Sequence, residues 1–247
     1  MKISTLNFYD IPISLRNKKS DFLDVKNFFL DHELDLLFIQ EMNFLKPKNN
    51  ESNFHIHFNP GLISKSGGLC TLSKTELKIN FKAFKAQRIK SSFMTIGDSI
   101  LKKGFQHFKF ESINFINTHL ASTYKNSNDE NLLITTQLLE LDEFVRSLDG
   151  PIVICGDFNI PPTHSSMQSF INSLSLKDYS DKIEVTLSTE NSNRKSFIHN
   201  KLHHLKNIRV DYILGKDVNI QNCELAFNQP IKGKHLSDHF GLIAEFK

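Results

Sequence analysis

Short segments in which apolar and polar residues alternate, or in which apolar residues run together, recur along the whole chain. Alternation with a period of two is typical of a strand that buries one face, and a short apolar run is typical of a strand that buries both. Residues 34–39 and 151–155 form such apolar runs. Further strands are predicted at residues 2–8, 54–58, 67–74, 78–84, 105–110, 113–118, 210–214, 222–227 and 242–246. Glu111-Ser112 lies between two of these segments and predicts a hairpin turn.

Three or four helices are predicted between the strands, and three of them can be placed. The clearest spans residues 130–148, where one face repeats apolar residues at spacings of four and three: Ile134, Leu138, Leu141, Val145 and Leu148. A second is expected at residues 20–32, with Ser20 as its cap and with Phe22, Val25 and Phe29 on one face. A third follows Pro161-Pro162 at residues 164–174.

Strands and helices follow one another in mixed order, without strict alternation. The chain has no internal repeat and no low-complexity linker. This order predicts an α/β chain of the α+β type, in which two mixed β-sheets pack face to face with helices outside. We expect one domain over residues 1–247, a length that suffices for a sizeable core.

Composition places the chain among ordinary globular proteins. Of its 247 residues, 39% are hydrophobic and 23% are charged, and the formal net charge of +3 is too small to argue by itself for a nucleic-acid partner. Cys70, Cys155 and Cys223 lie far apart in no metal-binding spacing, which argues against a disulfide framework and fits a reducing compartment. No segment approaches the roughly 18 apolar residues that span a bilayer, and the first residues lack the apolar core of a signal peptide. We therefore expect a soluble chain, cytoplasmic or exported without a visible signal peptide, and the sequence indicates no protein partner.

Polar residues repeatedly stand where predicted strands end. Asp157 and Asn159 lie two residues apart after an apolar strand, and Asp238-His239 precedes the last strand. Other strands carry polar residues at or near their ends: Asn7, Glu41, His119 and Asp211. Acid, amide and imidazole groups placed in this way can hold a hard cation, orient a water molecule and stabilise charge on a phosphate.

Six runs of the chain together resemble the endonuclease/exonuclease/phosphatase superfamily, also called DNase I-like. In the order of that family they are Leu6-Asn7, Phe38-Ile39-Gln40-Glu41, Asn117-Thr118-His119-Leu120, Gly156-Asp157-Phe158-Asn159, Arg209-Val210-Asp211-Tyr212-Ile213-Leu214 and Ser237-Asp238-His239. One such run is a weak signal, whereas six in order over nearly the whole chain are specific. The resemblance implies a four-layer sandwich of two packed sheets flanked by helices. It also implies an enzyme that cleaves phosphate esters with Mg²⁺, or with Mn²⁺, as its cofactor.

The resemblance assigns a metal site and a residue that acts on water. Glu41 would be the main metal ligand with Asn7 beside it, and Asp238 would lie near the metal or the attacking water. Asp157 would orient or deprotonate that water with help from Asn159. Which carboxylate is the base, and whether one or two cations bind, stays open at this point.

Three further roles follow from the same resemblance. His119 would donate a hydrogen bond to a phosphate oxygen as negative charge builds there. His239 would contact the phosphate or transfer a proton, and Asp211 would hold its ring. Taken singly, His119 could equally be a core histidine and Asp211 a turn residue, so the assignment depends on the six runs together.

Other histidines carry weaker signals. His55 and His57 share one face of a predicted strand and could bind zinc, but no Cys or acidic partner is evident, so we favour surface histidines. His203-His204 lies in a basic stretch at residues 194–209, which faces either an anionic substrate or, as we favour, solvent.

The substrate is selected by loops, which differ among nucleases, inositol-phosphate phosphatases and sphingomyelinases of this superfamily. Three segments resemble the neutral sphingomyelinase branch: residues 68–74, residues 98–105 with Asp98 and Lys103, and residues 137–141. Two positions fit the repair-endonuclease branch poorly, because Tyr9 stands where that branch carries an acid and Ser196-Phe197 where it favours Trp.

The resemblance therefore favours a sphingomyelin-like phospholipid as the phosphodiester substrate, with a nuclease as the alternative. An inositol-phosphate phosphatase is less favoured, because little room remains for its longer phosphate loop. A non-enzymatic binding module is less favoured, because no catalytic residue is missing. Lys103 could meet the substrate phosphate as a point charge, or Lys102-Lys103-Gly104 could be an ordinary charged turn.

Overall fold

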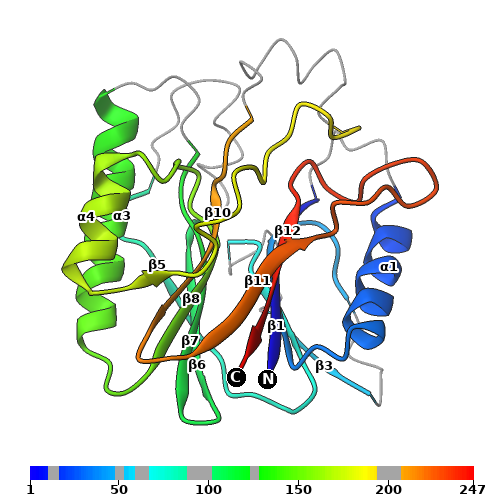
Figure 1. Cartoon of the computed structure of the whole chain (residues 1–247), viewed down its shortest axis with the longest axis horizontal. Helices are drawn as coiled ribbons and strands as arrows, with labels where there is room; N and C mark the ends of the chain where they lie inside the picture. The colour runs from blue at the N-terminus through cyan, green and yellow to red at the C-terminus, as the bar shows by residue number, and fades with distance from the viewer. Residues whose placement is uncertain (11–16, 48–52, 59–66, 88–101, 123–127, 194–206) are drawn as a thin grey trace.

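Two six-stranded β-sheets pack face to face at the centre of the protein (Figure 1). The computed structural model describes residues 1–10, 17–47, 53–58, 67–87, 102–122, 128–193 and 207–247. In spatial order the first sheet contains β11 (Ile220–Ala226), β12 (Gly241–Phe246), β1 (Lys2–Asp10), β2 (Leu36–Met42), β4 (Cys70–Ser73) and β3 (His55–Phe58). The second contains β5 (Asn80–Ala83), β6 (Gly104–Phe110), β7 (Ile113–His119), β8 (Ile152–Asp157), β10 (Asp211–Lys216) and β9 (Lys177–Asp178). Both sheets are mixed, because β1 runs parallel to β2 and β7 to β8 while the other neighbours are antiparallel.

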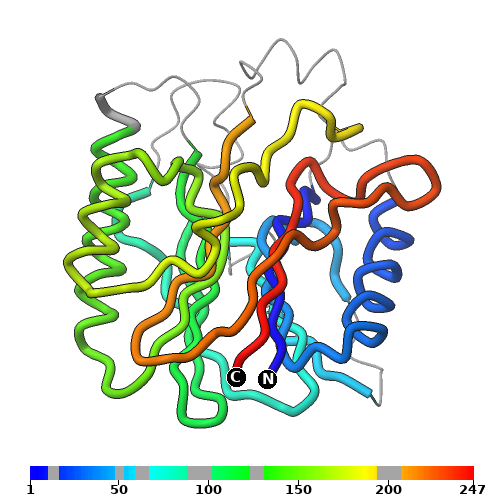
Figure 2. The backbone as a smooth tube through the Cα atoms, viewed as in Figure 1, coloured from blue at the N-terminus to red at the C-terminus, as the bar shows by residue number. Residues whose placement is uncertain are grey.

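Helices cover the outer face of each sheet. α1 (Lys18–Asp31) lies against the first sheet, and α3 (Asn128–Arg146) and α4 (Ser165–Ser173) lie together against the second (Figure 1). The tube in Figure 2 shows the same arrangement, with the blue α1 on one flank and the green α3 on the other. These four layers confirm the fold class that the sequence predicts.

Each interface between layers has its own apolar core. The core beneath α1 joins Phe29 to Ile39 of β2, and the core beneath α3 includes Leu141. Between the sheets, Phe38 stacks on Phe108 with 6.1 Å between ring centroids. The central strands are therefore buried on both faces, which explains the continuous apolar runs at residues 34–39 and 151–155.

Most elements lie where the sequence predicts them, and the exceptions are the start of α1 and the short strand β9. Glu111 and Ser112 have φ values of 46° and 68°, as a two-residue hairpin turn of type I′ requires. The prediction that Ser20 caps α1 is wrong, because the helix begins earlier and the Asn17 side chain accepts hydrogen bonds from the backbone N–H groups of Lys19 and Ser20 at 3.2 and 3.5 Å. The sequence pattern does not predict β9, since its two residues are too few to show a period.

Some predicted features lie outside the described residues. They are Asp98, Ser196-Phe197, His203-His204 and most of the basic stretch at residues 194–209. Within the described parts of the chain, no helix has the length and apolar character needed to cross a membrane.

Candidate active site

Residues that point between the sheets change from apolar to polar toward one edge. In β7 the inward series runs from Phe115 through Asn117 to His119. The parallel register pairs His119 with Asp157 at the end of β8, so the two polar ends lie side by side. β1 and β2 are also parallel and end at the same level. The chain termini lie at the opposite edge (Figure 1), where the N–H of Phe246 donates to the carbonyl of Met1.

Asp157 lies at the centre of the polar edge. Its Oδ2 accepts hydrogen bonds from Asn7 Nδ2 at 2.9 Å and from Asn159 Nδ2 at 3.3 Å. Its Oδ1 accepts one from the backbone N–H of Asn159 at 2.8 Å. The Nε2 atoms of His119 and His239 lie 3.4 and 3.9 Å from Oδ2. One carboxylate therefore contacts groups from four separate segments of the chain.

The pKa of Asp157 is raised to about 7. Burial has the largest effect, because the residue is only 1% exposed, and the carboxylates of Asp211 and Glu41 raise the pKa further. The positive charge of His239 and the hydrogen bond from Asn7 act in the opposite direction. A carboxyl group that titrates near neutral pH is suited to accept and return a proton.

Two of the site residues have a left-handed backbone conformation. Glu41 and Asn159 each have a φ of 56°. Gln40 points between the sheets, so regular alternation would send the side chain of Glu41 to the opposite face, and the positive φ breaks that alternation. β1 has an irregular register at the same level, between Asn7 and Asp10.

Gly156 lets β7 and β8 approach closely just before Asp157. Its φ is 142°, and a Cβ atom added there would lie 2.0 Å from the carbonyl oxygen of Thr118. Any other residue would separate the strands at the level where His119 and Asp157 meet.

Glu41 and Asp157 provide oxygen atoms that could hold a cation. Glu41 Oε1 lies 3.7 Å from His119 Nε2, and one ligand atom from each of Glu41, His119 and Asp157 lies within 4.8 Å of the others. Burial raises the pKa of Glu41, Lys103 opposes that rise, and Asp238 adds to it. Two adjacent carboxyl groups repel each other when both are ionised, and a divalent cation bound to them would offset that repulsion.

Lys103 and His119 form a buried pair, in which the ammonium group donates to the imidazole ring. Lys103 Nζ lies 2.9 Å from Nε2 and 3.2 Å from Nδ1 of the imidazole. Burial, together with the positive charges of Lys103 and His239, holds the pKa of His119 well below its usual value. A neutral imidazole beside an ammonium group can donate hydrogen bonds to an anionic ligand such as a phosphate.

His239 and Asp211 form a dyad. His239 Nδ1 lies 2.8 Å from Asp211 Oδ2, in position to donate a hydrogen bond. Burial alone would lower the pKa of His239, but Asp211, Asp157 and Asp238 together raise it to about 10. Asp211 Oδ1 is also buried and has no hydrogen-bond partner among the described residues. The dyad therefore holds a charged imidazole beside Asp157.

Thr186 connects the two segments that carry the dyad. Its hydroxyl oxygen accepts hydrogen bonds from the backbone N–H groups of Val210 and Asp211 at 3.1 and 3.3 Å, and its carbonyl accepts one from Phe240 at 2.8 Å. Sequence reasoning missed this residue, because a single threonine in a loop carries no recognisable pattern.

The structure brings every predicted site residue to the same edge: Asn7, Glu41, Lys103, His119, Asp157, Asn159, Asp211, Asp238 and His239. Their individual roles stay predictions. Asp238 is almost fully buried and influences the pKa values of both Glu41 and His239.

His55 and His57 lie away from this edge and do not form a zinc site among the described residues. Their rings stack with 6.3 Å between centroids, and His57 Nε2 lies 2.8 Å from Ser73 Oγ. No third Cys, His or acidic ligand groups with them in the described parts of the chain.

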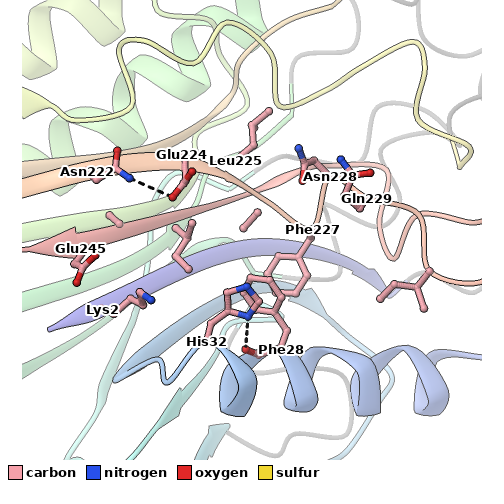
Figure 3. A pocket seen from close by; sticks show the side chains of 14 residues that line it. Lys2, Phe28, His32, Asn222, Glu224, Leu225, Phe227, Asn228, Gln229 and Glu245 are labelled. Atoms are coloured by element: carbon pink, nitrogen blue, oxygen red, sulfur yellow. Dashed lines mark hydrogen bonds between the residues drawn. The ribbon is translucent and has the colours of Figure 1, made fainter.

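A groove of about 500 Å³ opens elsewhere on the surface, between α1 and the strands β11 and β12. Phe28 lies between His32 and Phe227 on one wall, and Asn222 and Glu224 lie on another (Figure 3). None of the predicted site residues lines it, so the groove is separate from the polar edge.

Comparison with known proteins shows which family the sequence matches and which structures are similar to it. The profile of the Endonuclease/Exonuclease/phosphatase family matches residues 7–239. An AP endonuclease from Archaeoglobus fulgidus is similar in structure, with a TM-score of 0.70, 20% identity and coverage of 100% of this chain and 99% of the other. TDP2 from C. elegans has a TM-score of 0.70 at 17% identity over 99% and 74% of the two chains. Beta toxin from Staphylococcus aureus has a TM-score of 0.68 at 15% identity over 100% and 99%. A comparison with proteins of curated function found no sequence match.

Asp157→Asn should flatten the pH dependence of stability in the absence of metal. The folded-state pKa of about 7 lies above the unfolded value. The folded state therefore binds more protons between roughly pH 4 and that value, and stability falls as the pH rises through this window. In EDTA, the Tm of the wild-type protein should fall several degrees further across this window than the Tm of Asp157→Asn. Asp149→Asn, at an exposed position, should follow the wild type, and equal slopes in all three proteins would contradict the shift.

Proposed function

The chain belongs to the endonuclease/exonuclease/phosphatase family of phosphate-ester hydrolases, and we propose that it is a phosphodiesterase that depends on a divalent cation. The observation that carries this proposal is the convergence of carboxylate, amide and imidazole groups on Asp157 at one edge of the sandwich. Such a set can position water, balance charge and move protons around a phosphate.

Mg²⁺ is the cation that the donor set fits best, with Mn²⁺ as an acceptable substitute. Glu41 would be its main ligand, with Asn7 and Asp238 beside it, and carboxylate oxygens are the ligands that hard cations prefer. When bound, such a cation supplies Lewis-acid charge to a phosphate oxygen and makes a water molecule easier to deprotonate. The raised pKa of Glu41 supports the assignment, because a cation would compensate a carboxylate that burial disfavours.

Asp157 is the proposed base toward the attacking water. Its Oδ1 is fixed by the backbone of Asn159 and its Oδ2 by Asn7, so the carboxylate presents one defined orientation. A pKa of about 7 allows it to take a proton from water and release it within the physiological pH range.

His119 and Lys103 are the proposed phosphate contacts. They place N–H donors where negative charge would develop on the substrate, and burial strengthens such hydrogen bonds by excluding water. The side chain of Gln87 fixes the backbone of Lys103. The N–H of Lys103 donates to Gln87 Oε1 at 3.0 Å, and the carbonyl of Lys103 accepts from Gln87 Nε2 at 2.8 Å.

His239 is proposed to contact the phosphate as a charged donor or to transfer a proton. Asp211 bonds Nδ1 and so directs Nε2 toward the reacting group. The raised pKa of His239 keeps the ring charged before the reaction, which a general acid requires.

A sphingomyelin-like phospholipid is our favoured substrate, and nucleic acid is the alternative. The lipid assignment is supported by the resemblance of residues 68–74, 98–105 and 137–141 to the neutral sphingomyelinase branch. The nucleic-acid alternative is supported by the structural similarity to an AP endonuclease and to a TDP2 from D. rerio complexed with single-strand DNA product. Lys103 contacts His119, the other proposed phosphate contact, so it would serve either phosphodiester.

Activity should require a divalent cation. Hydrolysis of bis(p-nitrophenyl) phosphate should stop in EDTA and return with Mg²⁺, and Glu41→Gln should lower kcat by about 100-fold or more while leaving the fold intact. Glu143→Gln, at an exposed position of α3, is the matched control and should retain full activity. Undiminished hydrolysis in chelator would overturn the proposed function.

His239 and Asp211 should act as one unit. We expect His239→Ala to lower kcat by roughly 10³-fold or more and Asp211→Asn by less, because the imidazole persists without its orienting carboxylate. The double variant should be about as slow as His239→Ala alone. Losses that multiply in the double variant would show that the two residues act independently.

The substrate can be assigned with a small panel of phosphodiesters. If the lipid assignment is correct, the purified protein with Mg²⁺ should release phosphocholine from sphingomyelin in detergent micelles faster than it cleaves plasmid DNA, abasic DNA or RNA. Efficient nicking of DNA with intact sphingomyelin would instead establish the nuclease alternative. Glu41→Gln should lower either activity by the same factor as it lowers hydrolysis of the generic diester, which excludes a contaminating enzyme.

A further inference from the structure

A layer of uncharged polar side chains lies between the two sheets, directly beneath the charged residues of the active edge. Its members come from both sheets and are almost completely buried: Thr5, Gln40, Thr71, Gln106 and Asn117. Inward-facing positions of this kind are usually apolar, since burying an amide without a hydrogen-bond partner is destabilising. We call these five residues the amide layer.

Hydrogen bonds of the amide layer cross from one sheet to the other. Gln40 Nε2 of β2 donates to Asn117 Oδ1 of β7 at 2.7 Å and to Thr5 Oγ1 of β1 at 3.0 Å. Asn117 Nδ2 donates back to the carbonyl oxygens of Ile39 and Cys70 at 3.3 and 3.2 Å. The amides of Gln40 and Asn117 thereby connect three strands of the first sheet to one strand of the second.

Three members of the layer immediately precede residues of the site. Thr5 lies two residues before Asn7, Gln40 one residue before Glu41, and Asn117 two residues before His119. A displacement of any of these three strands would therefore move a site residue with it.

The contacts of the site also cross between the sheets. Asn7 Nδ2 to Asp157 Oδ2 measures 2.9 Å, and His119 Nε2 to Glu41 Oε1 measures 3.7 Å, with one member of each pair on each sheet. The apolar core below the layer has no directional preference, so it does not by itself fix how one sheet is placed along the other. Hydrogen bonds do fix it, because they weaken steeply with distance and angle.

We propose that Gln40 and Asn117 are positioning residues that align the two sheets at the active edge. The inference rests on the proposed function, because it assigns the layer a role in the geometry of that site. Apolar residues of the same size could stabilise the fold as well, since replacing both partners of a buried hydrogen bond can be nearly neutral. The amides instead specify one relative position of the sheets.

Gln40→Met tests the proposal, because it removes the amide and keeps a similar volume. We expect kcat for bis(p-nitrophenyl) phosphate to fall about 10- to 100-fold with little change in KM, since small misplacements of reacting groups have effects of this size. Thr71→Val is the matched control. It deletes the buried hydrogen bond from Thr71 Oγ1 to Gln106 Oε1, which also crosses the sheets, but β4 carries no proposed site residue. It should lower the Tm comparably and keep kcat within about twofold of wild type.

The double variant Gln40→Met/Asn117→Leu separates positioning from stability. Its Tm should recover toward the wild-type value while kcat stays low, and recovery of both together would overturn the proposal. If Gln40→Met does not fold, Thr5→Val removes an acceptor of the same amide and should lower kcat more than Thr71→Val does.

A readout that needs neither activity nor metal distinguishes failure of this inference from failure of the proposed function. In the metal-free protein, the NMR ring resonances of His119 and His239 should shift in Gln40→Met and stay at their wild-type positions in Thr71→Val. If wild-type protein hydrolyses no diester, the proposed function fails while this comparison still stands. Unchanged resonances in Gln40→Met would overturn the positioning role.

Discussion

The active edge depends on polar contacts that cross between two separate sheets. Asn7 and Glu41 belong to the first sheet, and His119 and Asp157 belong to the second. Across the sheets, the charge of Glu41 raises the pKa of Asp157 and the hydrogen bond from Asn7 lowers it, and burial makes each of those interactions stronger than it would be in water. A small relative shift of the sheets would therefore change both the geometry and the protonation of the site.

Much of this arrangement could be predicted from the sequence, because it follows from local periodicity. The stripe that includes Leu138 and Leu141 located α3, and two turn residues located the β6–β7 hairpin. Polar residues after apolar strands, such as Asp157, predicted the edge where the site lies, because parallel neighbouring strands end on the same side. The family profile, which matches residues 7–239, confirms the resemblance that the six runs carry.

Other features could not be predicted, because alternation does not distinguish a polar residue that faces solvent from one that faces another sheet. Gln40 and Asn117 fit a strand pattern, yet they are buried and bond to each other. The positive φ of Glu41 and the bridging contacts of Thr186 depend on tertiary packing and leave no local signal. The core residues do not reveal the substrate either, since a phosphate group needs the same contacts in a lipid and in a nucleic acid.

The central claim is that this edge binds a divalent cation through Glu41, and anomalous X-ray scattering from crystals soaked in MnCl₂ tests it directly. The account predicts an anomalous peak within coordination distance of the Glu41 carboxylate in the wild-type protein and its loss in Glu41→Gln. Binding of Mn²⁺ only at another place, such as His55 and His57, with no peak at the polar edge, would contradict it.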